Sequence, residues 1–273
     1  MKMDVETLKT LGYVAVDRPE GMREVADAAM LSWQHFCALP LDEKRIFSGG
    51  NRVKDFGYMM RQDKGANADS KELFHVKRLE IGEMRKRAAK ITDRRAVEFI
   101  NAVDALIEQT IGIVAHFTRA VERAYALRGF TSRVLAAQDQ WVFRYVHYMR
   151  GSMLAHPHTD RGGFTLHLNE SDAGGEYLTF DGEWRPWLVS ARRTVIFPSM
   201  GLQHFSKGKL KALCHRVVAN GKTSTHGRYS MVAFIDFFSE HRYDDSRRRL
   251  QDFEPGFNYQ LSFSDLERLF VPI

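Results

Sequence analysis

Two side chains that commonly bind metals lie two residues apart in the segment His156-Pro157-His158-Thr159-Asp160. Residues two apart on a β-strand project from the same face, so His158 and Asp160 could share one metal ion. Non-haem ferrous sites use two histidines and one carboxylate on one face of an octahedron, which leaves positions open for small ligands. This chemistry requires a second histidine from elsewhere in the chain. His156 lies two residues before His158, on the same nominal face of the strand, and competes with it as a ligand.

His215 is the candidate for the second histidine. It lies well downstream, in the apolar and strand-like stretch 213–217. The intervening sequence leaves room for several strands, so a sheet that folds back on itself could bring His215 to His158 and Asp160. Cys214 would then face the opposite side and pack as a small hydrophobic residue.

An arginine and a serine that could bind an anion together follow His215 along the chain. In Arg228-Tyr229-Ser230 the first and third residues would share one face of a strand. A guanidinium beside a hydroxyl suits the remote carboxylate of a dicarboxylic acid whose other end chelates a metal. The residues therefore indicate a site for a metal together with an organic anion.

The elements that must position these residues change in character along the chain. Apolar residues at three- to four-residue spacing predict helices at 22–36 and 41–46, and a long helix from Arg95 to near Gly129 capped by Thr92. A period of two predicts strands at 12–16, 141–149, 164–168, 176–180, 194–197, 213–219 and 229–237, and a short helix capped near Ser264 is expected at 265–270. These patterns predict a mainly β fold, an antiparallel sandwich or barrel, with flanking helices.

Length and composition favour one domain. The chain has 273 residues, of which 44% are hydrophobic, and no repeat or linker rich in Pro, Gly and Ser divides it. We expect a mostly helical N-terminal part at 1–135, a core of strands at 136–240 and a tail at 241–273. Segment 48–70 has no clear periodicity and is predicted to be a long loop. With 240–255, it is a candidate for an element that closes over the site.

Charge and cysteine content narrow the class of protein. Two cysteines give no disulfide framework, and neither a secretory signal nor a membrane-spanning run is evident, so we expect a cytoplasmic protein. The net charge of +6 raises the question of a nucleic-acid partner, but acidic residues are interspersed among the basic ones. An anionic small substrate explains the positive charge equally well. The sequence leaves the oligomeric state open.

Several further motifs accompany these residues. In chain order they are Phe36-x-x-Leu39-Pro40-x-x-x-Lys44, Lys71-Glu72-x-Phe74, Arg144-x-x-x-Tyr148, His158-Thr159-Asp160-x-Gly162, His215-Arg216-Val217 and Arg228-x-Ser230. Together they resemble the isopenicillin N synthase-like family of Fe(II)- and 2-oxoglutarate-dependent oxygenases. The resemblance covers most of the chain and implies a double-stranded β-helix, the jelly roll of cupin-like proteins.

The resemblance also implies roles for individual residues. It makes His158, Asp160 and His215 the catalytic Fe(II) ligands. It makes Arg228, Ser230 and Tyr148 the residues that bind 2-oxoglutarate, with O2 as the other co-substrate. Four other histidines in the second half of the chain are expected to be ordinary strand or loop residues, namely His147, His167, His204 and His226.

The chain departs from the family pattern in a few places. Val146 stands where the family often has Asn, and Met149 stands where it usually has Pro. Residues 221–227 lengthen the gap between His215 and Arg228, although a loop can absorb such an insertion. Arg216 is either a surface charge or a structural residue beside the metal.

The implied activity is that of a 2-oxoglutarate-dependent dioxygenase, an oxidoreductase that releases succinate and CO2. Hydroxylation of a small-molecule metabolite is the first expectation, but desaturation, cyclisation and ethylene formation occur with the same ligands. Two other functions stay open at this point. One is a non-catalytic jelly-roll protein that binds a metal or an organic acid, and the other is a nucleic-acid demethylase with the same iron chemistry.

Overall fold

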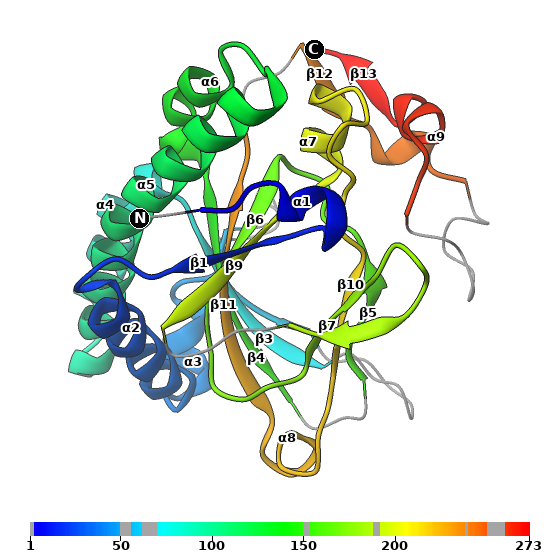
Figure 1. Ribbon diagram of the computed structural model, residues 1–273. Coiled ribbons are helices and arrows are strands. Elements are labelled where there is room, and N and C mark those ends of the chain that lie inside the picture. Colours follow the sequence, from blue (N-terminus) through cyan, green and yellow to red (C-terminus); the bar gives the residue numbers. More distant parts are fainter. Residues whose placement is uncertain are drawn as a thin grey trace.

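The structure, a computed structural model, describes residues 3–49, 56–61, 70–149, 153–187, 192–237, 240–249 and 260–273. Its strands pair antiparallel in a larger sheet, a smaller sheet and a two-stranded ribbon (Figure 1). The larger sheet has the order β1 (Val14–Asp17), β9 (Arg193–Pro198), β6 (Phe164–Glu170), β11 (Arg228–Ile235), β4 (Val142–Tyr148), β3 (Lys71–Val76) and β2 (Gly57–Arg61). The smaller sheet has the order β5 (Met153–His158), β10 (His215–Val218), β7 (Gly175–Leu178) and β8 (Trp184–Pro186), and the ribbon joins β12 (His241–Tyr243) to β13 (Phe270–Pro272).

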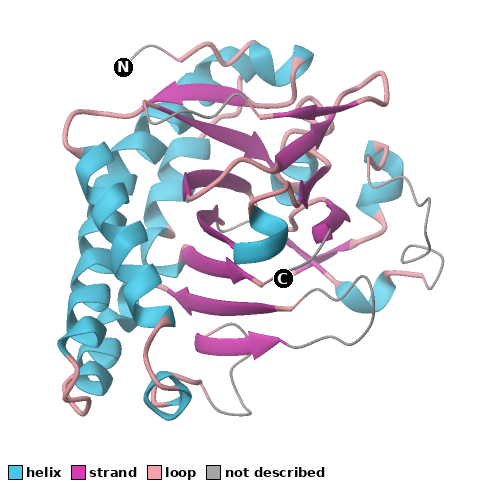
Figure 2. Ribbon diagram, turned by 90° about the horizontal axis from the view of Figure 1, so that it is seen from below, coloured by secondary structure: helices cyan, strands magenta, loops and turns pink. Residues whose placement is uncertain are grey.

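The longer helices form a layer along one side of the strands, and several short helices lie elsewhere (Figure 2). The helices are α1 (Thr7–Thr10), α2 (Met22–Cys37), α3 (Leu41–Arg45), α4 (Ile81–Ala88), α5 (Arg94–Tyr125), α6 (Phe130–Ala136), α7 (Met200–Phe205), α8 (Thr223–His226) and α9 (Phe263–Glu267). The apolar faces of α2 and α5 and one face of the larger sheet form a common core. Trp33 lies within it, with ring centroids 5.3 Å from Phe99 of α5 and 6.0 Å from Tyr145 of β4.

The predicted fold class is confirmed, because these sheets and helices form the jelly roll that the resemblance implies. The N-terminal part, which was expected to be mostly helical, also contributes β1, β2 and β3 to the larger sheet. β2 lies inside segment 48–70, so the prediction of one long loop there was wrong for residues 57–61. The rest of that prediction, at 50–55 and 62–69, lies outside the described residues, as does 250–255 of the second candidate closing element.

Helix ends differ from the prediction for identifiable reasons. The long helix α5 begins at Arg94 because the Asp93 carboxylate, rather than Thr92, accepts a hydrogen bond from the Arg95 backbone amide. It ends at Tyr125, and Gly129 instead precedes α6 with a left-handed backbone. In the tail, Ser262 caps α9, and the chain turns back into a strand at Phe270.

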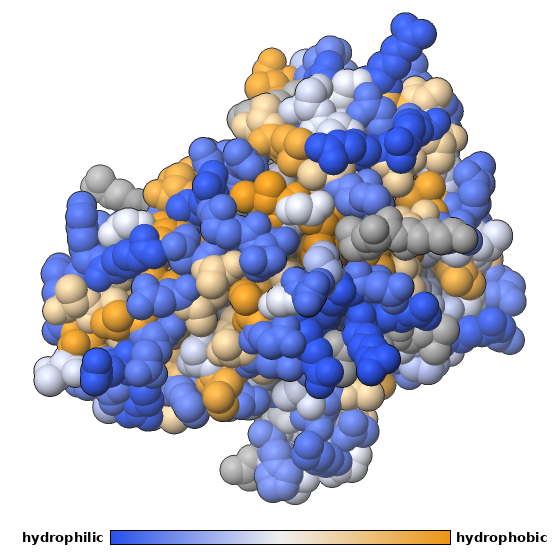
Figure 3. Space-filling view, turned by 60° about the vertical axis from the view of Figure 1, so that its left-hand side comes forward, coloured by the Kyte–Doolittle hydropathy of each residue, from blue (hydrophilic) through white to orange (hydrophobic). Residues whose placement is uncertain are grey.

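The outer face of the helical layer is mostly hydrophilic, with scattered apolar side chains (Figure 3). The exposed ones on or near these helices are single residues such as Leu31, Leu79 and Val97. Isolated exposed apolar residues of this kind are common on protein surfaces. Among the described residues, no helix combines the length and the apolar character needed to span a membrane.

A buried ionic cluster joins the two N-terminal sequence motifs. The ammonium of Lys44 forms an ion pair with Glu72 and donates to the Cys37 carbonyl oxygen at 2.9 Å. Glu72 also accepts hydrogen bonds from Tyr58 at 2.7 Å and from His147 Nδ1 at 3.0 Å. Cys37, Glu72 and His147 offer metal-ligand atoms within 4.8 Å of one another, but the Lys44 ammonium already supplies the positive charge there. We therefore interpret this cluster as structural.

The Glu72 cluster should make the free energy of unfolding depend on pH. Burial favours the neutral acid, but hydrogen bonds from His147, Lys44 and Tyr58 outweigh it and lower the pKa of Glu72 from 4.5 to about 2. The resulting stabilisation is present above pH 4.5 and is lost as the pH falls through about 2. Glu72→Gln should lower the free energy of unfolding by about 3–5 kcal/mol at neutral pH, because buried Lys44 loses its counter-ion.

Urea unfolding at several pH values would measure this effect. The difference between wild type and Glu72→Gln should shrink as the medium becomes acidic. Glu183→Gln is a matched control because the Glu183 carboxylate is exposed and pairs with exposed Arg185. Equal losses of stability in the two variants would contradict the interpretation.

Candidate metal centre

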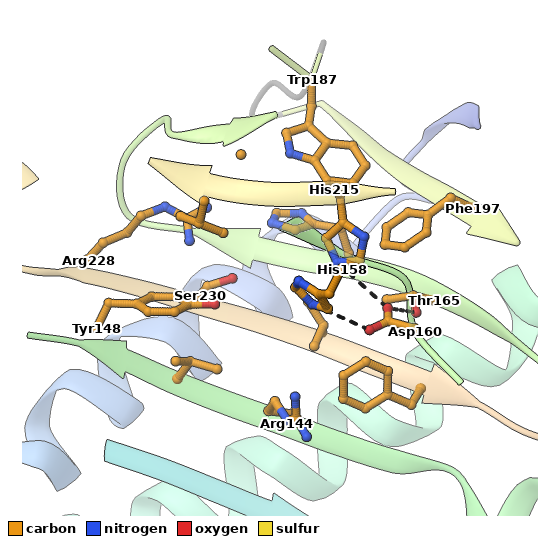
Figure 4. A pocket seen from close by; sticks show the side chains of 16 residues that line it. Arg144, Tyr148, His158, Asp160, Thr165, Trp187, Phe197, His215, Arg228 and Ser230 are labelled. Carbon is orange, nitrogen blue, oxygen red and sulfur yellow. Dashed lines mark hydrogen bonds and ion pairs between the residues drawn. The ribbon is translucent and has the colours of Figure 1, made fainter. Parts of the chain in front are cut away.

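The register of β5 and β10 brings two predicted ligands together. His158 ends β5, His215 begins β10, and the two are direct partners across the antiparallel pair. Asp160 follows two residues after His158. Its carboxylate oxygens lie 3.8 Å from His158 Nε2 and 3.9 Å from His215 Nε2 (Figure 4). The three residues thus present their ligand atoms to one point.

The tautomers of both imidazoles suit a metal ion. Nδ1 of His158 lies 2.7 Å from the carbonyl oxygen of His156, and Nδ1 of His215 lies 3.2 Å from that of Leu213. A carbonyl oxygen can only accept, so each Nδ1 carries the proton and each Nε2 presents a lone pair. Two lone pairs beside the Asp160 carboxylate repel one another until a cation lies between them. The donor set therefore fits a divalent transition metal.

The charge states of these groups agree with this interpretation. Burial and the neighbouring His215 lower the pKa of His158 to about 4, so its imidazole is neutral at physiological pH. Burial opposes ionisation of Asp160, but the two histidines and a hydrogen bond from Thr165 lower its pKa overall. Thr165 Oγ1 donates to Asp160 Oδ2 at 2.5 Å. Thr165 orients the carboxylate toward the histidines, and no motif in the sequence indicates this residue.

Two neighbouring candidates lie outside this cluster. His156, the competing ligand, is exposed and does not belong to the group formed by His158, Asp160 and His215. Arg216 donates to Glu176 at 2.7 Å, and its guanidinium lies 4.1 Å from the ring centroid of Trp184. Since Glu176 and Trp184 belong to β7 and β8, Arg216 ties neighbouring strands of the smaller sheet together.

The other predicted site residues line the same pocket from the larger sheet. Arg228 and Ser230 lie on β11, and Tyr148, on the adjacent β4, is the direct partner of Arg228 (Figure 4). The Arg228 guanidinium lies 5.8 Å from the Tyr148 ring centroid, and its side chain is 2% exposed. Residues 221–227 accommodate the short helix α8, and Arg228 is still the first residue of its strand. Val146 also faces this pocket.

Side chains along β11 alternate between two environments. Met231, Ala233 and Ile235 belong to the core under the helices. Ser230, Val232 and Phe234 line the pocket between the sheets. The wall of the pocket is therefore a single layer of strands.

A β-bulge in β6 brings an unpredicted carboxylate to the pocket side. Val232 pairs with His167, but Ser230 pairs with Glu170, so β6 holds one residue more than β11 over this stretch. The register shift places Glu170 opposite Ser230, which itself lines the pocket. Strict alternation from His167 would have placed Asn169 on the pocket side instead. His167, expected to be an ordinary strand residue, also lines the pocket.

Aromatic residues and a second cation complete the walls. The aromatic residues are Trp187, Phe197 and Phe234. The guanidinium of Arg144 lies 4.5 Å from the Phe234 ring centroid, and its Nε donates to His75 Nε2 at 2.6 Å. Two neighbouring strands thus hold a positive charge at the pocket wall. The motif Arg144-x-x-x-Tyr148 contained Arg144 but did not indicate that its charge would lie at the pocket wall.

Comparison with known proteins agrees with this geometry. Residues 138–237 match the sequence model of the 2OG-Fe(II) oxygenase superfamily. That segment contains all six residues predicted to bind the metal and the organic anion. The matched model represents the broad superfamily rather than its isopenicillin N synthase-like branch. No protein with a curated description matches the chain.

Solved structures share the fold over nearly the whole chain. A protein assigned to the 2OG-Fe(II) oxygenase family from Caulobacter crescentus has 23% identity and a TM-score of 0.70, over 96% of this chain and 90% of that one. Neurospora crassa T7H, in complex with alpha-KG and thymine, has 16% identity and a TM-score of 0.72, over 96% and 89%. The dioxygenase for auxin oxidation 1 from Arabidopsis thaliana, bound to 2-oxoglutarate, has 16% identity and a TM-score of 0.67, over 86% of each chain.

Proposed function

We propose that this protein is an Fe(II)- and 2-oxoglutarate-dependent dioxygenase that oxidises a small organic molecule. One observation carries the proposal: two histidines and a carboxylate share a pocket with a buried arginine and a serine. The first group suits ferrous iron, and the second suits the remote carboxylate of a dicarboxylic acid. The superfamily match over the same residues supports this interpretation.

The residues of the chain would divide the work between them. His158, Asp160 and His215 would hold iron, which would supply O2 activation coupled to oxidative decarboxylation of 2-oxoglutarate to succinate and CO2. Arg228, Ser230 and Tyr148 would hold the remote carboxylate of that co-substrate. The aromatic walls would exclude water from the reacting centre.

For the primary substrate we propose a small molecule that carries a negative charge or a strong hydrogen-bond acceptor. Arg144 supplies a cation at the pocket wall, and Phe234 beneath it offers an apolar surface. One structural neighbour is solved in complex with thymine and another is named for auxin oxidation, which supports a small organic compound as the substrate. Hydroxylation is the reaction we propose first, since it needs no further group in the pocket.

Succinate production tests the proposed function directly. We expect purified protein with Fe(II) and O2 to convert 2-oxoglutarate to succinate, and a panel of small organic acids to accelerate this turnover. A chelator should abolish it, and added Fe(II) should restore it. A protein that only binds metal would bind Fe(II) and 2-oxoglutarate without releasing succinate, and that outcome would exclude the enzymatic proposal.

The same assay distinguishes a nucleic-acid demethylase from a small-molecule oxygenase. If the protein were a nucleic-acid demethylase, methylated oligonucleotides would stimulate turnover and small acids would not. The binding of these oligonucleotides would weaken steeply with salt. We expect no such stimulation.

A further inference from the structure

The arginine proposed to bind the co-substrate already has a carboxylate partner from its own chain. Arg228 Nη2 donates to Glu170 Oε2, and Arg228 Nε donates to the Asp172 carbonyl oxygen at 2.9 Å. Nη1 of the same guanidinium is buried and has no hydrogen-bond partner among the described residues. One terminal nitrogen is therefore occupied, and the other is left for a ligand.

The two groups lie on the same side of the sheet because of the bulge in β6. The shift places Glu170 opposite Ser230, the residue that would share the ligand with Arg228. His167 also lies close to the Glu170 carboxylate, with its Nε2 3.3 Å from Oε2, the oxygen that Arg228 contacts. A ligand carboxylate at Nη1 would therefore bind the same guanidinium as Glu170.

Glu170 is ionised at physiological pH. Burial raises its pKa, but the neighbouring His167 imidazole and the Arg228 guanidinium lower it to about 2. Other charged groups near this pair are Arg18 and Asp172, and Asp172 is itself paired with Lys222 at 2.6 Å. A second carboxylate on Arg228 would thus meet the repulsion of a resident anion.

We propose that Glu170 is the resident counter-ion of the co-substrate arginine. It holds the buried guanidinium of Arg228 in position while the pocket is empty, and it weakens the binding of a co-substrate that brings its own remote carboxylate. This inference rests on the proposed function, because it takes Arg228 as the binding site of 2-oxoglutarate. Glu170 is a positioning residue, and its effect should depend on the charge at the far end of the ligand.

Anaerobic titration with 2-oxoglutarate tests the proposal without turnover. Chelation of Fe(II) by a 2-oxo acid gives a weak charge-transfer band in the visible, and its growth yields a dissociation constant. Glu170→Gln keeps an oxygen that can accept from Arg228 but removes the charge. We expect this variant to bind 2-oxoglutarate about tenfold more tightly than wild type, because the like charge is gone. Its affinity for 2-oxobutyrate, which has no remote carboxylate, should be unchanged.

The counter-ion role also predicts a change in the empty protein. Without Glu170 the buried Arg228 lacks a charged partner, so the thermal midpoint of Glu170→Gln should fall, and 2-oxoglutarate should raise it more than in wild type. Glu176→Gln is a matched control, since it removes another glutamate that pairs with an arginine, Arg216, in the smaller sheet. It should leave the dissociation constant unchanged.

The outcomes separate this inference from the proposed function. If wild type gives no band with Fe(II) and 2-oxoglutarate, the proposed function fails. If wild type gives the band and Glu170→Gln binds 2-oxoglutarate equally or more weakly, the counter-ion proposal is overturned. Should Glu170→Gln not fold, Glu170→Asn serves the same test, because it also removes the charge. Its dissociation constant for 2-oxoglutarate should fall as well, and an unchanged value would overturn the proposal.

Discussion

Replacing His158 with alanine is expected to eliminate tight iron binding and to abolish succinate production. Changes to residues that merely orient a metal ligand cost about 10–100-fold in affinity, so loss of a ligand should cost more. His158 Nε2 is one of only two nitrogen donors in the cluster with Asp160 and His215. Anaerobic Fe(II) titration and metal analysis of the purified protein would measure the loss.

His156→Ala is the matched control for this experiment. It removes a histidine from the same strand, two residues earlier, where the side chain is exposed. We expect its iron content and turnover to stay close to wild type. If His156→Ala lost iron while His158→Ala kept it, the assignment of the ligand would be wrong.

Replacing Arg228 with methionine should remove most of the affinity for 2-oxoglutarate. Removal of one partner from a buried, hydrogen-bonded charge pair costs about 2–5 kcal/mol, which corresponds to a loss of roughly 30- to 5000-fold in affinity. The side chain is 2% exposed, so water can do little to replace it. The charge-transfer titration would report the change while Fe(II) binding at the histidines stays intact.

A double variant separates loss of binding from loss of folding. Arg228→Met alone leaves the Glu170 carboxylate buried without its cation, which by itself destabilises the fold. Arg228→Met combined with Glu170→Gln removes both charges. We expect the double variant to recover stability but to remain deficient in 2-oxoglutarate binding. Affinity like that of wild type in the double variant would contradict the role of Arg228.

The sequence predicted strands at the positions of β4, β10 and β11 because their alternation is regular. It indicated no strand at β5, and Asp160 lies two residues beyond the end of β5 rather than on it. Residues 158 and 160 lie two apart, and His215 pairs with His158 as a folded-back sheet requires. The long helix was equally clear, since its apolar residues recur over many turns. Its cap was misplaced by one residue, because Thr92 and Asp93 are both good caps and only the backbone geometry decides between them.

Other features depend on contacts that a single sequence does not display. β2 was missed because residues 48–70 have no periodic pattern, and no strand was predicted at 71–76 either. β3 pairs with β4 and β2 pairs with β3, and this pairing makes them strands. Glu170 was missed because the bulge in β6 moves the side chains after it to the opposite face of the sheet from the one that regular alternation predicts. Thr165 belongs to no spacing that indicates a ligand. Arg144 entered only as part of the Arg144-x-x-x-Tyr148 motif, which assigns it no role of its own.

The alternation along β11 has a practical consequence for protein engineering. Pocket positions such as Val232 and Phe234 are interleaved with core positions such as Met231 and Ala233 on a wall that is one strand thick. A mutant library restricted to the alternate residues that face the pocket could vary substrate preference while leaving the packing against the helices unaltered. A library that randomised consecutive residues would mix the two effects, and many of its members would be lost to misfolding before their selectivity could be read.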